Sequence, residues 1–180
     1  LSLICPFGPL EDIAVAAARS GLKKNTTLRE LTLEFSRGTT ISPILTSVRD
    51  HPLLERLCLH GYAIDLTGLE TVLLSETSKI TELDIHRFYR GPRIVGLNNV
   101  LQALAQRPTL TKLGLHFCRL GPDEARLIRI AFYSTRSLQS LDLASNDLGS
   151  AELAELAPAL YRNTSIKVLD ISGNNLIDIE

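Results

Sequence analysis

The sequence predicts an α/β solenoid, in which short parallel strands stack on one side and helices on the other. Two observations predict this fold: an apolar six-residue pattern recurs along the whole chain, and amphipathic helical segments separate its copies. Leucine accounts for 34 of the 180 residues, while methionine and tryptophan are absent. A unit of this kind buries its apolar side only by stacking on its neighbours.

The six-residue pattern places an apolar residue at its first, fourth and sixth positions. It occurs at residues 28–33, 54–59, 80–85, 110–115, 138–143 and 166–171, and residues 1–3 supply the second half of a further copy. Successive copies are 30, 26, 26, 30, 28 and 28 residues apart. Alternating apolar residues predict a short strand with one buried face. We therefore expect about six and a half repeats of 26–30 residues in a single domain, residues 1–180.

Each strand is expected to lead through a turn into a helix. The clearest helix covers residues 149–160, where Leu153, Leu156 and Leu160 share one face. The same apolar face recurs in two earlier units, as Ala125, Ile128 and Phe132, and as Val100, Leu101 and Leu104. Asn146 lies before the last helix, and Asn174 lies after the last strand. Both are placed to bond backbone groups of adjacent turns.

These features resemble the leucine-rich repeat proteins, and the 26–30-residue periods with full helices are similar to the ribonuclease-inhibitor-like subtype. That subtype includes the repeat regions of NOD-like receptors, Ran GTPase-activating proteins and tropomodulins. Cys118, Asn146 and Asn174 occupy the Asn/Cys position of the family motif. At the same position the earlier repeats have Pro6, Ser36, Tyr62 and Phe88. The resemblance implies a horseshoe with parallel strands on the concave face and helices on the convex face.

The concave face is predicted to be mildly acidic. Because the strand leucines point into the core, the residues before, between and after them line the exposed face. This face carries six carboxylates, namely Glu30, Glu34, Glu82, Asp84, Asp142 and Asp170, against the two cations Arg56 and Lys112. One interpretation is a solvated sheet face; the other is a docking surface for a basic protein segment.

Three histidines, His60, His86 and His116, fall at equivalent positions of successive strands. We expect no metal there, because a parallel ladder splays side chains that zinc would need to converge at about 2.1 Å. An interface that loosens when the histidines become protonated is one alternative, and a plain polar column is the other.

No catalytic arrangement is predicted. Cys58 with His60 or His86 and Asp84 suggests a nucleophile, but that chemistry needs an oxyanion site and a pocket that excludes water. An open ladder supplies neither. The sequence also lacks a glycine-rich phosphate loop and the HExxH and GxSxG motifs. We therefore expect no enzyme and no cofactor.

A second candidate surface is the loop at residues 86–93, which belongs to a 30-residue unit and is expected to bulge at the end of its strand. Arginine and tyrosine are residue types that anchor interfaces. We expect the loop to contact a partner through Arg87, Tyr89, Arg90 and Arg93. The alternative is that its aromatic residues, Phe88 above all, cover the gap left by the missing asparagine.

Charge and composition exclude several partners. A net charge of −1 argues against a nucleic-acid or anionic-membrane binder, and no apolar run approaches the roughly 18 residues of a membrane span. Three scattered cysteines favour a reducing, cytoplasmic setting. Neither end shows a polar cap, which predicts either a fragment of a longer solenoid or end-to-end self-association.

The function expected from these features is that of a scaffold-like protein-interaction module, which binds a protein partner through the concave face and the 86–93 loop. On the concave face the candidate partner-binding residues are His60, Glu82, Asp84, His86, His116 and Asp142. The family resemblance leaves two alternatives open. These are a GTPase-activating protein of the Ran-directed type, and the repeat region of an innate-immunity-type receptor or of a pathogen effector.

Overall fold

The computed structural model describes residues 2–5, 11–35, 42–62, 64–88, 93–106 and 109–175. Within them, seven strands form one parallel sheet in chain order, so that each strand pairs with the preceding and the following one. The strands are β1 (Ser2–Cys5), β2 (Glu30–Phe35), β3 (Arg56–Gly61), β4 (Glu82–Arg87), β5 (Lys112–His116), β6 (Ser140–Asp142) and β7 (Val168–Asp170). The α/β solenoid that the repeats predict is confirmed.

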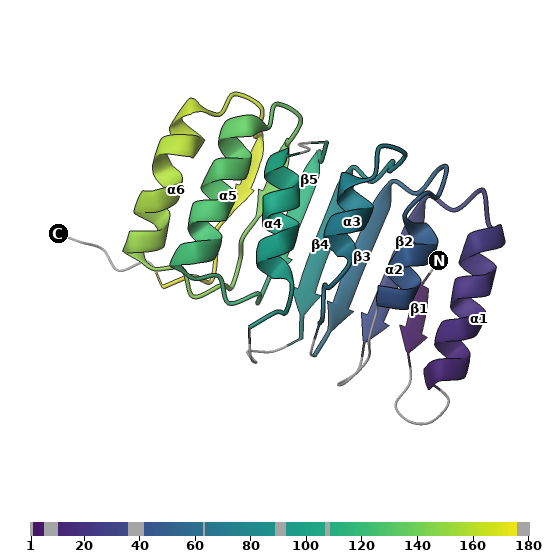
Figure 1. The fold of residues 1–180 in the computed structure, drawn as a ribbon. Coiled ribbons are helices and arrows are strands. Elements are labelled where there is room, and N and C mark those ends of the chain that lie inside the picture. The colour runs from purple at the N-terminus through teal and green to yellow at the C-terminus, as the bar shows by residue number, and fades with distance from the viewer. Residues whose placement is uncertain are drawn as a thin grey trace.

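The helices lie side by side on one face of this sheet (Figure 1). They are α1 (Glu11–Lys24), α2 (Ser42–Val48), α3 (Leu69–Leu74), α4 (Leu97–Gln106), α5 (Pro122–Ser134) and α6 (Ser150–Arg162). The last of these confirms the helix predicted at 149–160 and extends it by two residues. Among the described residues, none of the helices is long and apolar enough to cross a membrane.

Most strands begin later than the six-residue pattern does. The first apolar residue of the pattern lies in the turn before the strand, where it is still buried: Leu54, Leu110 and Leu138 are each at most 4% exposed. The strand itself starts two residues later in β2 to β7. The pattern therefore identifies the buried residues correctly, but it places the start of each strand two residues too early. The reason is that its first apolar residue lies in the turn and still packs into the core.

The core lies between the sheet and the helices. In β3 and β4, buried and partly exposed residues alternate, so that Leu57, Leu59, Leu83 and Ile85 face the helices. The predicted inward faces of α4 and α5 are buried as well, and Val100 and Leu101 are fully covered. This alternation is what sends the intervening residues of each strand to the opposite face of the sheet.

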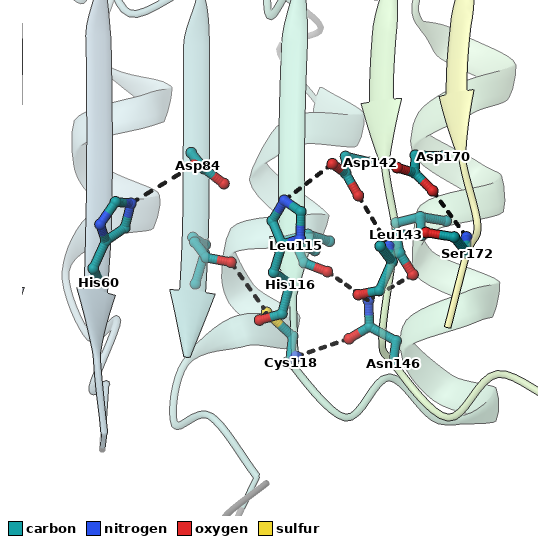
Figure 2. Close-up of polar contacts among 12 residues, drawn as sticks. His60, Asp84, Leu115, His116, Cys118, Asp142, Leu143, Asn146, Asp170 and Ser172 are labelled. Carbon is teal, nitrogen blue, oxygen red and sulfur yellow. Dashed lines mark hydrogen bonds and ion pairs between the residues drawn. The ribbon is translucent and has the colours of Figure 1, made fainter. Parts of the chain in front are cut away.

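An asparagine ladder ties the last three repeats together, and Figure 2 shows the bonds of its first member, Asn146. Asn146 is completely buried, and its Oδ1 accepts a hydrogen bond from the Cys118 amide at 2.7 Å. Its Nδ2 donates to the Leu115 and Leu143 carbonyl oxygens. Asn174 repeats the pattern one turn later, accepting from the Asn146 amide at 2.9 Å. The two asparagines thus satisfy backbone groups that the strands leave unpaired as the chain turns away.

The turns of these repeats share one backbone conformation. Phe117 and Ser145 have φ angles of 51° and 59°, and Arg119 and Asp147 have φ angles of 56° and 63°. Each pair is separated by 28 residues, one repeat length. Gly173, a further 28 residues on, has a φ of 65°. Such left-handed residues are uncommon, so their recurrence at repeat spacing shows that the ladder fixes a defined turn.

The edge strand β7 carries apolar side chains that the described part of the chain does not cover. Val168 is 58% exposed and Leu169 is 41% exposed, whereas the equivalent Leu141 of β6 is fully buried. A further repeat or a second copy stacked on β7 would bury them. End-to-end association stays a prediction.

We expect Asn146→Ala to lower the free energy of unfolding by about 2–4 kcal/mol, because it leaves several buried backbone groups without partners. Urea denaturation followed by circular dichroism measures the effect. Asn99→Ala is the matched control, since Asn99 is exposed on α4 and should tolerate alanine without loss. Equal stability of Asn146→Ala and the wild type would show that the ladder does not hold the repeats together.

Candidate partner-binding face

The strand residues that point away from the helices form the open face of the sheet, which none of the described helices covers (Figure 1). Strand register aligns them in three rows. The charged row contains Glu30, Arg56, Glu82 and Lys112. The middle row contains Thr32, Cys58, Asp84, Gly114, Asp142 and Asp170. The histidine row contains Glu34, His60, His86 and His116.

Opposite charges alternate along the charged row and compensate one another. Arg56 lies between two carboxylates, with Nη1 2.8 Å from Glu30 Oε2 and Nε 2.7 Å from Glu82 Oε2. Lys112 Nζ lies 3.7 Å from the same Glu82 oxygen. Hydrogen bonding from Arg56 lowers the pKa of Glu82, and both carboxylates together raise the pKa of Arg56. This row therefore adds little net charge to the open face.

The acidity of the open face comes mainly from the middle row, and Glu34 adds one carboxylate at the end of the histidine row. Asp142 Oδ1 accepts a hydrogen bond from the Ala144 amide at 3.0 Å, and Oδ2 lies 3.0 Å from His116 Nε2. Asp170 Oδ1 accepts from the Ser172 amide at 2.8 Å, and this bonding lowers the pKa of Asp170. The backbone thus fixes the two aspartates at the start of neighbouring turns, as Figure 2 shows.

A hollow of about 250 Å³ opens on this face over Gly114. Asp84 and Asp142 flank the glycine on the adjacent strands, and Lys112 and His116 lie on either side of it along β5. A β-carbon at position 114 would lie 2.4 Å from Asp84 Oδ1, so the carboxylate occupies space that any other residue would fill. Glycine at this position, where the neighbouring strands have aspartate, lets the Asp84 carboxylate lie over β5 at the edge of the hollow.

The three histidines are neighbours, as their spacing predicts. The ring centroids of His60 and His86 are 5.7 Å apart, and those of His86 and His116 are 5.1 Å apart. Burial lowers the pKa of His86, and the charges of His116 and His60 lower it further. His86 is therefore neutral at pH 7, and only the outer two histidines lie close to a carboxylate, Asp84 for His60 and Asp142 for His116.

Aromatic rings border the histidine row. The sequence analysis did not assign two of them, Tyr62 and Phe117, to this face. Phe117 stacks on His86 at 6.1 Å, with an angle of 11° between the ring planes. Tyr62 contacts Phe88 edge-on at 5.2 Å. Phe88 is 38% exposed, and the alternative that it covers the gap of the missing asparagine stays a prediction. The sequence signal that could have placed these rings here is their position, because Tyr62, Phe88 and Phe117 each come directly after a strand.

The expectation for the 86–93 loop needs correction at Arg87. This residue ends β4, and its side chain is 1% exposed, because strand alternation places it on the same face as Leu83 and Ile85. A guanidinium buried there cannot contact a partner. Arg93 is exposed as expected, but its Nη1 lies 3.2 Å from Glu124 Oε1 on α5. Tyr89 and Arg90 lie outside the described residues.

Side chains from β3 and β4 converge at one place on the open face. One ligand-type atom of each of Cys58, His60 and Asp84 lies within 4.8 Å of the other two. The three atoms are neighbours at a looser spacing than bound ligands have, so the expectation of no metal stays a prediction. Burial and the negative charge of Asp84 raise the pKa of the Cys58 thiol, so the cysteine lacks the thiolate character of a nucleophile.

Comparison with known proteins agrees with the repeat pattern. A family model described as "Leucine Rich repeat" matches residues 135–156 and 162–178. The chain is 30% identical over 133 residues to the bovine (Bos taurus) protein named NACHT, LRR and PYD domains-containing protein 5. The match covers 71% of this chain, and it spans about 12% of the length of that relative.

We expect His86 to titrate below its ordinary pKa of 6.5, because burial and its two histidine neighbours disfavour the charged ring. The free energy of unfolding is then highest above pH 6.5 and falls as the pH drops from 6.5 through the folded-state pKa. Side-chain NMR in buffer containing a metal chelator measures the titration. His116→Ala should raise the pKa of His86, because it removes a neighbouring charge and some burial. A wild-type His86 pKa at or above 6.5 would contradict the packing of this row.

Proposed function

Because the chain belongs to the leucine-rich repeat proteins, whose repeats generally mediate protein–protein interaction, we propose that it is an interaction module that binds a basic segment of a partner protein on its open face. The observation that carries this proposal is the hollow over Gly114 between Asp84 and Asp142. It presents two carboxylates, on β4 and β6, on either side of an opening over β5.

The size and charge of the hollow suit a single long cationic side chain. Its volume of about 250 Å³ is below that of most small-molecule pockets, which are about 300–1,000 Å³. A lysine or arginine can enter it while its aliphatic stem packs on the sheet and its charged end meets the aspartates. Lys112 at the rim turns toward Glu82 at 3.7 Å, so its charge is partly compensated.

The proposal divides the predicted site residues into two groups. Asp84 and Asp142 contact the partner directly, while Glu82 orders the charged row through Arg56 and Lys112. His60, His86 and His116, with the exposed rings of Tyr62 and Phe88 beyond them, supply an aromatic flank for apolar parts of the same partner. Aromatic anchors beside charged contacts are the usual composition of an interface core.

A second candidate function is supported by the relative. The name of that protein lists a NACHT and a PYD domain beside its repeats, and this chain matches about 12% of its length. We therefore propose, as the alternative, that these repeats belong to a larger receptor-like protein. Sequencing the full transcript tests this: a NACHT domain encoded with the repeats supports it, and a transcript without one excludes it. No observation favours a Ran-directed GTPase-activating role.

We expect peptides selected from a random phage-displayed library on the wild-type protein to be rich in lysine and arginine. Their affinity for the Asp84→Asn/Asp142→Asn variant should be about tenfold lower, since both carboxylates of the hollow become neutral. The control, Asp123→Asn/Glu155→Gln, removes two carboxylates from α5 and α6 and should bind like the wild type. Equal loss in both variants, or selection of peptides without basic residues, would refute the proposal.

Gly114→Val tests the shape of the hollow without changing any charge. Valine suits a strand, but its side chain fills the hollow and displaces the Asp84 carboxylate. We expect the fold to be kept, as judged by circular dichroism, and the same peptides to bind at least about tenfold more weakly. Unchanged peptide affinity in a folded Gly114→Val protein would show that the partner does not enter the hollow.

A further inference from the structure

Cys58, His60 and Asp84 are brought together by strand register. Cys58 and His60 are two residues apart on β3, so both point to the open face. Asp84 on β4 is the direct cross-strand partner of Cys58. Thiolate, imidazole and carboxylate are the three side-chain groups that bind zinc, and here two adjacent strands offer one of each.

The distances among these groups are close to those of a metal site. One ligand atom from each residue lies within 4.8 Å of the other two, and His60 Nε2 is 3.7 Å from Asp84 Oδ2. Ligand atoms around a tetrahedral zinc ion are roughly 3.3–3.8 Å apart, given bonds of about 2.0–2.3 Å. Side-chain rotations that move the ligand atoms by roughly 1 Å would therefore bring them to the spacing of zinc ligands.

Two of the groups each have a buried atom without a hydrogen bond in the described structure. His60 Nε2 and Asp84 Oδ1 are buried atoms for which no hydrogen bond is found among the described residues. The neighbouring pair differs, because His116 Nε2 and Asp142 Oδ2 are 3.0 Å apart, and the strand position equivalent to Cys58 is Gly114. Asp84 Oδ2 lies 3.7 Å from His60 Nε2, and Oδ1 lies on the side of Gly114. A cation between His60 Nε2 and the Asp84 carboxylate would give the unbonded imidazole nitrogen a partner.

The surrounding charges permit a cation to bind. Arg56, two residues before Cys58, is held between Glu30 and Glu82, which offset its charge. The negative charge of Asp84 adds to the attraction for a divalent ion.

We propose that Cys58, His60 and Asp84 form a site for a zinc-class divalent cation on the open face of the sheet. The three side chains supply three ligands, and the fourth position faces outward, open to water. On binding, the Cys58 thiol releases its proton to solvent and the sulfur bonds the ion as a thiolate, while His60 binds as neutral imidazole. The site shares Asp84 with the hollow of the proposed function, but zinc uptake is measured without any peptide, so failure of one proposal can be told from failure of the other.

The test is a titration of the whole chain with Zn²⁺ against a chromophoric chelator, and with Co²⁺ followed by absorption. We expect about one saturable site per chain and, with Co²⁺, a thiolate charge-transfer band. Cys58→Ser, His60→Ala and Asp84→Asn should each weaken binding at least about tenfold, since even the loss of an outer-shell partner costs 10–100-fold. His116→Ala and Asp142→Asn are the matched controls, taken from the neighbouring pair, and should bind like the wild type.

Protection of the thiol keeps the proposal testable if a variant fails to fold. In the wild type, Zn²⁺ should slow alkylation of Cys58, measured by mass spectrometry, while leaving the rate at the buried Cys118 unchanged. Three results would overturn the proposal: no saturable uptake up to about 1 mM Zn²⁺, equal weakening by the His116→Ala control, or alkylation of Cys58 at the same rate with and without zinc.

Discussion

Burial of every second strand residue is the constraint on which the rest of this structure depends. Leucine and isoleucine at alternate positions of each strand must face the helices, so the residues between them have to lie on the open face. Parallel pairing in chain order then sets each of these residues about 4.8 Å from its counterpart in the next repeat. The core therefore determines which polar side chains meet, and the functional surface follows from it.

The three rows of the open face use that geometry in different ways. In the charged row, Arg56 bridges Glu30 and Glu82, and the charges offset one another. In the middle row, the side chains are mostly acidic and Gly114 leaves a gap between two of them. In the histidine row, neighbouring rings disfavour the protonation of His86. One repeat architecture thus places a neutral border beside an acidic hollow, which is the charge contrast that a basic ligand would recognise.

The sequence predicted the fold and the alignment of the candidate residues because both depend on the period of the repeat. His60, His86 and His116 are adjacent because they occupy one position in successive units. The error at Arg87 arose from treating it as loop, although alternation from Ile85 already pointed it inward. The convergence of Cys58, His60 and Asp84 depends on side-chain rotamers, and so does the gathering of rings around His86. A repeat pattern fixes the face on which a side chain lies, but it does not fix its rotamer.

The central claim is that the open face, around the hollow at Gly114, is the surface that contacts a partner. Chemical-shift mapping tests it most directly, using the isotope-labelled protein and the tightest-binding basic peptide. The account predicts that the largest amide shifts fall on Asp84, Gly114 and Asp142, at the centre of the middle row. Largest shifts on α4, α5 and α6, with the strand amides unchanged, would place the partner on the helical side and contradict the account.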